Sequence, residues 1–524
     1  MSGRGRKAAL SAGAVAIALT AAACGGGSSP SGRSTAPTGG GPLTVASSVA
    51  PPTLDLTSNP AAAIDEALDY NVYQHLVQLD PKGHIVPVLA TAYSVSADGL
   101  TYTFTVRSGV TFSNGDPMTP ADVVFSLQRA MAPNSTYPYK AVLGGVTSVA
   151  VSGTNQVVVT LSKPNNQFLY DLAAYSNGVV LDPKAVGTIA TAPVGTGPYK
   201  FTGFVPNYSL SFTLNPSYWG PKPGVSSLVF RYFPNANAEN SALQSGQVQV
   251  VDNLPNPQDV SQFKGNSAYK VIAGPTNGKI QMTINNSSGP LSHAKVRQAI
   301  SYATDKQAIL QAAGAGYGTV IGSDTVPGDP WYLPSLAQVY PYNPAKAKQL
   351  LTEAGYPSGF ALTLTLPPYG YAQTAGPLIA AELNAVGIRT TIKNIQWPLW
   401  ISQVFLHGDF QLTIVDHVEA RDVGNYANCG YYWKYAQCSQ VASMLSAAQA
   451  ATSQSGMVSG YQQILTKITA AAVNDWLYNP DQITVAKANI VGLPTSGRTE
   501  SFDLTHASIG GTVSAQAQAQ GYSS

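Results

Sequence analysis

The stretch FALTLTLPPYGYAQTAGPLIAAELNAVGIRTTIKNIQWPLWISQVFLHGDFQLTIV, residues 360–415, decides the fold class. Within it, short apolar runs rich in β-branched residues alternate with longer runs of helical character. The expected strands span residues 360–366, 388–392 and 410–415, and the expected helices span residues 378–386 and 397–406. Gly387 and Gly408 end the two helices. Strands and helices that alternate through short links predict a mostly parallel sheet with right-handed crossovers.

The part of the chain before this stretch is richer in strands. Residues 101–106 alternate threonine with Tyr102, Phe104 and Val106, as a half-buried strand should, and residues 157–161 are a second β-rich run. Between them, Thr119-Pro120-Ala121-Asp122 is typical of a helix start, with Thr at the N-cap, Pro at N1 and an acid at N3. We therefore expect α/β lobes, one of which carries a β-rich insertion.

The N-terminus is typical of an exported protein. A basic start that includes Arg4 precedes an uncharged, mostly apolar run at residues 8–23, which is shorter than the approximately 20 apolar residues of a membrane span. Three alanines lead directly into Cys24, an arrangement that resembles a bacterial lipobox. We expect a signal peptide at residues 1–23 and a lipidated Cys24, with a secreted chain and an incidental cysteine as the alternative. The Gly/Ser/Pro/Thr-rich segment 24–42 is expected to be a flexible tether.

Composition narrows the class of partner. Charged residues make up 10% of the chain, against roughly 25% in an average domain. The 28 basic and 26 acidic residues nearly cancel, so nothing indicates a nucleic-acid partner. Without Cys24, the remaining cysteines are Cys429 and Cys438. In an oxidising compartment such a pair most simply forms a local disulfide, and a metal site is the weaker alternative.

The densest group of ionisable residues follows the last strand of the quoted stretch, at residues 416–422. In open α/β sheets, ligands bind beyond the carboxyl ends of the strands. An aromatic group follows it: Tyr426, Tyr431, Tyr432, Trp433 and Tyr435. Carboxylates beside aromatic side chains suit an ammonium group or a polar peptide, whereas the alternative is a solvated loop of ion pairs.

Several ordered blocks resemble the family 5 extracellular solute-binding proteins, the peptide- and nickel-binding class of ABC importers. The blocks are Pro87–Ala90 with Tyr93, Asp98-Gly99, Tyr102–Phe104, Arg107–Val110, Phe112, Asn114-Gly115, Thr119–Ser126, Pro193–Tyr199, Asn215 with Tyr218–Gly220, Val296–Ile300 with Ala303 and Asp305, and Ala345–Leu351 with Glu353–Tyr356. Each block alone is weak, but their common order covers nearly all of the body.

The resemblance implies an α/β, two-lobed periplasmic-binding-protein-like fold with a hinge and an extra β-rich subdomain. The expected divisions are lobe I at 43–283, including the extra subdomain at about 74–195, lobe II at 284–483, and a return to lobe I with the C-terminal tail at 484–524. It also implies a monomeric, non-enzymatic receptor without a cofactor, which binds oligopeptide or dipeptide-like solutes outside the cell. The expected partners are an ABC permease and ATPase, and the only expected link to the membrane is the lipid anchor on its outer face.

The resemblance also assigns site residues. A family segment like Gly-Trp-x-x-Asp-x-x-Asp-Pro, laid without gaps, places Glu419 at the acid that neutralises the ligand amine and Asp422 at the second acid. Here Val415 and Asp416 replace Gly-Trp, and Val423 replaces Pro. The complete set of expected ligand-binding residues is Glu419, Asp422, Arg421, Asp416, Trp397, Tyr432 and Trp433. For Trp397, which resembles a family tryptophan, core packing is the alternative, and the family also supports a Cys429–Cys438 disulfide.

Other functions remain open as alternatives. Four residues, Asp416, His417, Glu419 and Asp422, could hold a divalent metal or a metal chelate, as in nickel-binding relatives. A secreted hydrolase is disfavoured, because the sequence has no Gly-x-Ser-x-Gly elbow, no His-Glu-x-x-His helix and no phosphate loop. A receptor that senses peptides without transporting them is a further alternative.

Overall fold

The structure is a computed structural model that describes residues 40–524. The predictions of a signal peptide at 1–23 and of lipidation at Cys24, and most of the predicted tether at 24–42, lie outside the described residues. Within residues 40–524, every helix falls short of the length or the apolar character that a bilayer crossing requires.

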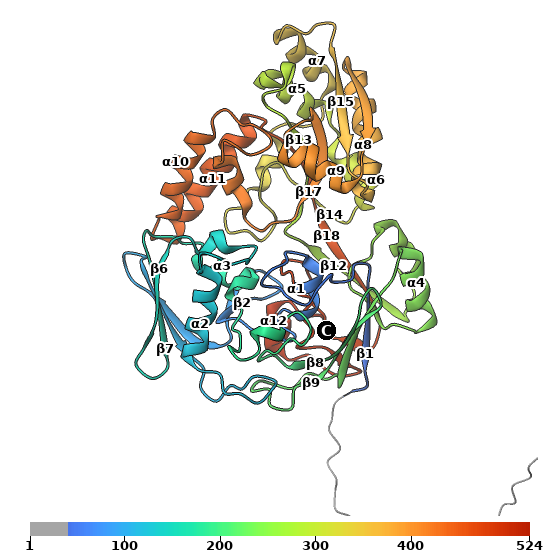
Figure 1. The fold of residues 1–524 in the computed structure, drawn as a ribbon. Coiled ribbons are helices and arrows are strands. Elements are labelled where there is room, and N and C mark those ends of the chain that lie inside the picture. Colours follow the sequence, from blue (N-terminus) through green and yellow to red (C-terminus); the bar gives the residue numbers. More distant parts are fainter. Residues whose placement is uncertain (1–39) are drawn as a thin grey trace, which may run out of the picture. The chain divides into compact units, whose positions relative to one another are not determined.

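A twelve-stranded mixed sheet runs through the described chain (Figure 1). Its strands follow the spatial order β16 (Ile388–Asn394), β15 (Phe360–Leu366), β17 (Leu412–His417), β13 (Lys279–Ile284), β18 (Asp475–Lys487), β11 (Val250–Val251), β1 (Leu43–Ser47), β10 (Ser227–Tyr232), β9 (Ser209–Leu214) and β8 (Tyr199–Val205), while β12 (Tyr269–Pro275) and β14 (Gly318–Val320) also pair with β18. Strand β18 belongs to both halves of this sheet. Its beginning pairs with β13 and its end with β12 and β11.

The predicted parallel unit at 360–415 is confirmed, because β15 pairs in parallel with both β16 and β17. The expectation of a mostly parallel sheet is wrong for the sheet as a whole. Strands β13 and β18, through which the chain enters and leaves this half, run antiparallel to their neighbours. The first expected helix is longer, α8 (Gly370–Ala385), and the second divides into α9 (Trp397–Trp400) and a wider π-helical turn at Ile401–Leu406.

The β-rich insertion contains an antiparallel four-stranded sheet in the order β4 (Ala90–Val95), β5 (Thr101–Val106), β7 (Gln156–Leu161) and β6 (Val146–Ser152). Strand β5 buries alternate residues, as its pattern predicts. Helix α2 (Pro120–Met131) packs on this sheet and begins at the predicted cap, where Thr119 and Asp122 form a capping box.

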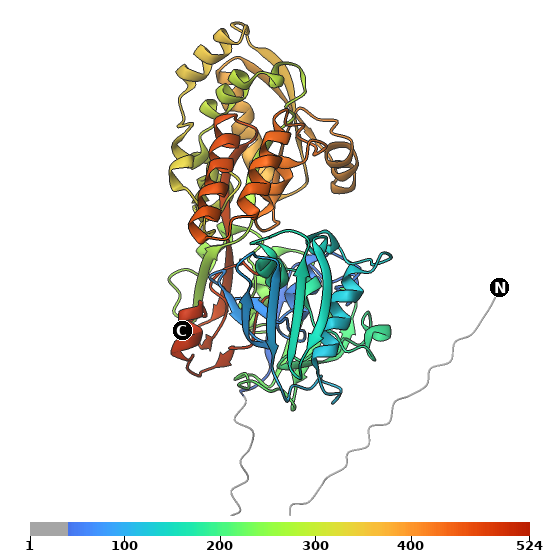
Figure 2. The same ribbon diagram turned by 90° about the vertical axis from the view of Figure 1, so that its left-hand side faces the viewer.

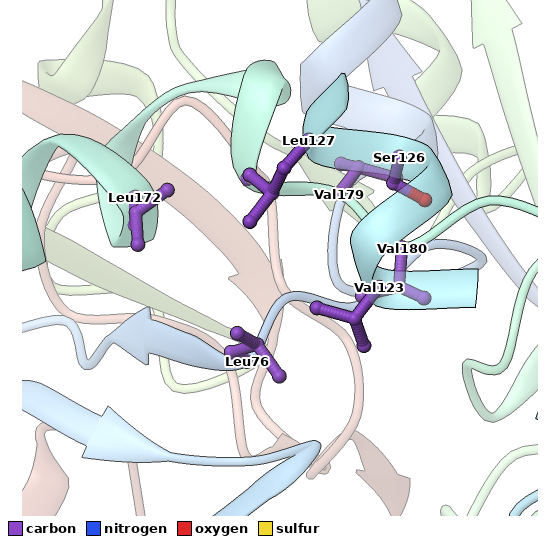
Figure 3. Close-up of a pocket in the computed structure, with 8 residues that line it drawn as sticks. Leu76, Val123, Ser126, Leu127, Leu172, Val179 and Val180 are labelled. Atoms are coloured by element: carbon purple, nitrogen blue, oxygen red, sulfur yellow. The ribbon is translucent and has the colours of Figure 1, made fainter. Parts of the chain in front are cut away.

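Figure 3 shows a hollow beside α2, where Leu76, Val123, Leu127 and Leu172 approach one another. The hollow is too small to admit a water molecule and its wall is almost wholly apolar. These leucine and valine side chains therefore belong to the core of the insertion, and they form no ligand site.

The remaining elements are mainly helices that cover the sheet and close the loops. They are α1 (Ala62–Leu68), α3 (Phe168–Ala174), α4 (Ala236–Ser245), α5 (Ala294–Ala303), α6 (Lys306–Gly314), α7 (Pro344–Glu353), α10 (Cys438–Gln449), α11 (Gln454–Ala470) and α12 (Ala515–Gln520), with the short strand pairs β2 (Val77–Leu79)–β3 (Ile85–Pro87) and β19 (Ile490–Val491)–β20 (Ser508–Ile509). Helices α10 and α11 lie side by side (Figure 2).

The buried apolar side chains form separate clusters. One cluster contains buried side chains from residues 43–250 and 486–507. Two other clusters contain different buried side chains from the second half of the chain, within residues 280–478 and 321–476 respectively. Between these bodies the chain crosses at residues 275–279 and 478–481. There the Asn479 side-chain amide donates to the carbonyl oxygens of Thr276 (3.0 Å) and Gly278 (2.7 Å). The separate clusters fit two lobes, and the exact lobe boundaries stay a prediction.

Candidate ligand-binding site

Strand β17 positions the predicted charged segment. The strand continues through Asp416 and His417, so these two residues are part of the sheet rather than of the loop. Residues 418–421 form the loop, and a 3₁₀ helix follows at Asp422–Ala427. Arg421 has a left-handed backbone, with φ of 53°, a conformation that L-residues seldom adopt. The loop thus changes direction sharply within four residues of the sheet edge.

Asp422 forms a buried ion pair. Its carboxylate lies 2.8 Å from the Lys279 ammonium, and the two side chains are 8% and 2% exposed. Burial by itself raises the pKa of the Asp422 carboxyl, but Lys279 and His417 outweigh it and hold that pKa well below its usual range. Lys279 also donates to the carbonyl oxygens of Glu419 (2.8 Å) and Asn277 (3.2 Å), so its three N–H donors all have partners within the chain.

Glu419 is placed differently from Asp422. Its side chain is 53% exposed, and the nearest basic atom is Nδ1 of His417 at 3.8 Å. His417 in turn is buried and bonds the Tyr432 hydroxyl through Nε2 at 2.8 Å. Ligand atoms of His417, Glu419 and Asp422 lie within 4.8 Å of one another. The acid predicted to receive an amine is therefore a solvent-accessible carboxylate beside a buried imidazole.

The predicted aromatic residues separate into two groups. Tyr432 and Trp433 are 3% and 1% exposed, and Trp433 stacks on Tyr426 with ring centroids 4.4 Å apart. They lie behind the loop and support it from the core. Trp397 is half-buried, stacks on Trp400 at 4.8 Å and meets Tyr369 edge-on at 5.1 Å. Ligand contact by Trp397, Tyr432 and Trp433 stays a prediction, which their surroundings favour most for Trp397.

Contacts between the loop and the β-rich insertion fix Arg421. Its guanidinium lies over the Tyr170 ring, 3.4 Å from the centroid, and donates to the Gln167 side chain at 3.0 Å. Beside it, the Tyr175 hydroxyl donates to the Ala420 carbonyl oxygen at 3.1 Å. The loop from the second half of the chain therefore closes onto the insertion, and Arg421 is a fixed part of that contact.

A cavity of about 550 Å³ lies next to this loop, between segments from both halves of the chain. Asp416 and Val418 line it from β17 and the loop, and Gly278 lines it from the crossing segment. Its wall also contains tyrosines and acids that the sequence patterns did not indicate: Tyr317, Tyr369, Tyr371, Tyr478, Asp481 and Glu500. Tyr369 and Tyr371 follow the carboxyl end of β15, so the rule that pointed to residues 416–422 could have found them.

The carboxyl groups of this cavity are poorly compensated. Burial raises the pKa of Asp416 to about 6, although Lys279 and His417 lower it in part. Burial also raises the pKa of Glu500 to about 7, although a hydrogen bond with Asp65 lowers it in part. Burial also raises the pKa of Asp481. One carboxylate oxygen of Asp416, Oδ1, is buried without a hydrogen-bond partner. Such groups gain most from a cation that enters the cavity.

The disulfide prediction is confirmed. Cys429 and Cys438 are bonded, with Cα atoms 5.1 Å apart, so the alternative of a metal site at these cysteines is excluded. The bond joins the segment after the 3₁₀ helix to the first residue of α10. It therefore restrains the polypeptide that carries Tyr432 and Trp433 behind the loop.

The chain matches known proteins over most of its length. Residues 84–432 match the family model of bacterial extracellular solute-binding proteins, family 5. The chain is 32% identical over 374 residues to heme-binding protein A of Haemophilus influenzae, covering 64% of this chain and 68% of that protein. It is 31% identical over 371 residues to the dipeptide-binding protein of Escherichia coli, covering 64% and 69%.

Solved structures agree with this assignment. HbpA2 from Haemophilus parasuis superposes with a TM-score of 0.77 at 25% identity, over 90% of this chain and all of that chain. The substrate-binding protein CtaP from Listeria monocytogenes has the same fold, with a TM-score of 0.81 at 20% identity and the same coverage. Because the family consists of binding components of ABC importers, the prediction that the chain is not an enzyme is confirmed. The chain belongs to the family 5 bacterial extracellular solute-binding proteins.

Proposed function

We propose that the chain captures oligopeptide or dipeptide-like solutes through their free amino group and delivers them to an ABC permease. The observation that carries this proposal is the exposed Glu419 carboxylate, which has no Lys or Arg partner among residues 40–524. This side chain is 53% exposed in the loop after β17, next in sequence to Val418, which lines the cavity. The resemblance to the family segment supports Glu419 as the amine-binding acid, and several relatives are named as binding proteins for dipeptides or for glutathione.

In this proposal, closure of the two lobes over the ligand strengthens ligand binding. The loop that carries Glu419 also carries Ala420 and Arg421, which contact Tyr175 and Gln167 of the insertion. A ligand that bridges Glu419 and the opposite wall stabilises the arrangement in which these contacts exist, because it interacts with that arrangement more strongly than with an open one. The permease then recognises the closed, loaded receptor.

A lipid on Cys24 would hold this monomeric receptor at the outer face of the cell membrane, near the permease and ATPase. The apolar run and the small residues before Cys24 support this part of the proposal. A Cys24→Ser variant is expected to move from the membrane fraction to the medium. A variant that stays membrane-bound, with no lipid found on the wild-type N-terminus by mass spectrometry, would contradict the anchor.

Binding of matched peptides tests the amine-binding role. Dipeptides are expected to raise the melting temperature of the full chain by a few degrees at saturation. Glu419→Gln should weaken a dipeptide with a free amine by about tenfold or more, because a charge-assisted hydrogen bond is lost. The same dipeptide with an acetylated amine should bind wild type and variant alike. Equal losses for both peptides would remove Glu419 from the amine-binding role.

A metal or metal chelate is the second candidate, since His417, Glu419 and Asp422 offer three ligand atoms within 4.8 Å. The Lys279 ammonium already occupies the Asp422 carboxylate, so a metal ion would meet a fixed positive charge beside it. This favours the organic ligand. Nickel chloride and a nickel chelate belong in the same thermal assay, and stabilisation by either, with no response to peptides, would reverse the choice.

A further inference from the structure

We propose that the cavity beside Glu419 selects ligands with a net positive charge, and that it has no counter-charge for the free carboxylate of a peptide. This inference rests on the proposed function and names the ligand class within it: amine-bearing peptides whose carboxyl end is amidated, or compact oligoamines. An ordinary zwitterionic dipeptide should therefore bind more weakly than its C-terminal amide.

The cavity wall carries charge of one sign. Asp416, Asp481 and Glu500 line it, and among its described lining residues there is no Lys, Arg or His. Behind Glu500 lies Asp65, whose side chain is buried and whose Oδ1 has no hydrogen-bond partner. Burial first, and the charge of Glu500 second, raise the pKa of Asp65 well above its usual value. A ligand in this cavity therefore meets only acidic groups among the wall's ionisable side chains.

Basic side chains near the lining segments are already engaged. The Lys279 ammonium pairs with the Asp422 carboxylate and donates to the carbonyl oxygens of Glu419 and Asn277. Arg498 lies between two lining residues in sequence, but it is 2% exposed and binds the Asp329 carboxylate at 2.9 Å. Arg421 lines a different hollow, where it covers Tyr170. A ligand carboxylate in the cavity would need one of these groups to leave its present partner.

The aromatic part of the wall fits the same ligand class. Tyr317, Tyr369, Tyr371 and Tyr478 all line the cavity. A tyrosine face attracts an ammonium group, especially where water is scarce. The Tyr371 hydroxyl accepts the backbone N–H of Asp416 at 3.2 Å, which holds this ring next to the acid. Ring faces and carboxylates together favour a cation with apolar substituents.

The loss of hydration on entering the cavity strengthens the preference for a cationic ligand over an anionic one. An ammonium group that enters loses hydration but gains the negative wall, whereas a carboxylate loses hydration and meets like charge. Like charges brought together at a poorly solvated site are strongly unfavourable. The raised pKa values of Asp416 and Glu500 agree with this, because an incoming cation would stabilise the ionised forms of both carboxyl groups.

Calorimetry with three probes tests the inference on the full chain at pH 7.5. The probes are a dialanine-type peptide with a free carboxyl end, the same peptide as its C-terminal amide, and a linear diamine. The amide should bind at least about tenfold more tightly than the free acid. The variant Asp481→Asn should reduce this preference by about threefold, whereas Asp409→Asn, at an exposed site outside the cavity wall, should leave it unchanged.

Each outcome bears on peptide capture, on charge selection or on both. A free acid that binds as tightly as its amide would overturn the charge selection and leave peptide capture standing. A diamine that binds while both peptides fail would support charge selection and reject peptide capture. Failure of all three probes would reject both. If Asp481→Asn unfolds, the amide-to-acid ratio of the wild type still decides the charge selection.

Discussion

The fold treats the Asp422 carboxylate and the carboxylates of the cavity wall in opposite ways. Around Lys279, the Asp422 carboxylate is buried and paired. Along the cavity wall, Asp416, Asp481 and Glu500 are also removed from water, yet the wall residues include no basic side chain among those described. Asp416 and Asp422 belong to the same charged segment of the sequence, residues 416–422. The difference teaches that an acid with a buried basic partner stabilises the loop, whereas an acid without one remains available to a ligand.

The largest expected effect comes from breaking the paired group. Lys279→Met leaves Asp422 as a buried, unpaired charge and should lower the free energy of unfolding by about 3–5 kcal/mol. Chemical denaturation followed by circular dichroism measures the change. Lys295→Met is the matched control, because Lys295 pairs with Glu353 on the surface and such a pair contributes about 0–1 kcal/mol. Similar losses for both variants would show that the Lys279 pair is no more important than a surface pair.

The unpaired group should make stability depend on pH. Burial raises the pKa of Glu500 to about 7 in the folded chain, against about 4.3 in an unfolded one. The folded state therefore holds its proton more tightly, so this contribution to stability is full below about pH 4 and is lost as the pH rises through 7. The melting temperature of ligand-free Glu500→Gln should fall less than that of wild type between pH 5.5 and 8.

A second raised carboxyl sharpens this test. Burial raises the pKa of Glu382, on α8, to about 7 as well, but Glu382 is not among the residues of the cavity wall. Glu382→Gln should therefore flatten the pH dependence of stability in the same direction. Only Glu500→Gln should also reduce the rise of amine affinity between pH 6 and 8. If both variants change the affinity equally, Glu500 acts on the fold rather than on the ligand.

The smallest expected effect concerns the aromatic support of the loop. The Tyr432 hydroxyl bonds Nε2 of His417 and lies 3.4 Å from the Thr283 hydroxyl. Tyr432→Phe should cost about 1 kcal/mol of stability, the contribution of a typical hydrogen bond. Peptide affinity should stay within about twofold of wild type if Tyr432 only supports His417. A tenfold loss of affinity with unchanged stability would instead make Tyr432 a ligand contact.

Local patterns predicted those parts of the fold that local forces determine. The strand at 360–366 and the helix start at Thr119 follow from side-chain alternation and from capping chemistry, which act within a few residues. The antiparallel entry of β13 and β18 escaped prediction, because β18 pairs with strands that lie about two hundred residues earlier. Pairing of this kind depends on the whole chain and leaves no short pattern.

In the candidate site, too, features within one segment could be predicted, whereas contacts between distant segments could not. The position of Glu419 and the Cys429–Cys438 bond could be predicted from one segment and its family resemblance. The partner of Asp422 could not, because Lys279 lies more than a hundred residues away and meets it only across the β13–β17 ladder. The presence of Asp481 and Glu500 in the cavity wall could not be predicted either. Both lie about sixty or more residues after the charged segment, on or after β18, and reach the cavity only through the fold of the whole chain.

Mass spectrometry of the ligand that co-purifies with the chain tests the central claim most directly, because a closed cleft retains its solute. Protein purified without denaturation should release a small compound with a free amine and a net positive charge, and a chain carrying Glu419→Gln should release less of it. Release of an anionic or uncharged compound, or of a metal chelate, by the wild-type chain would contradict the account.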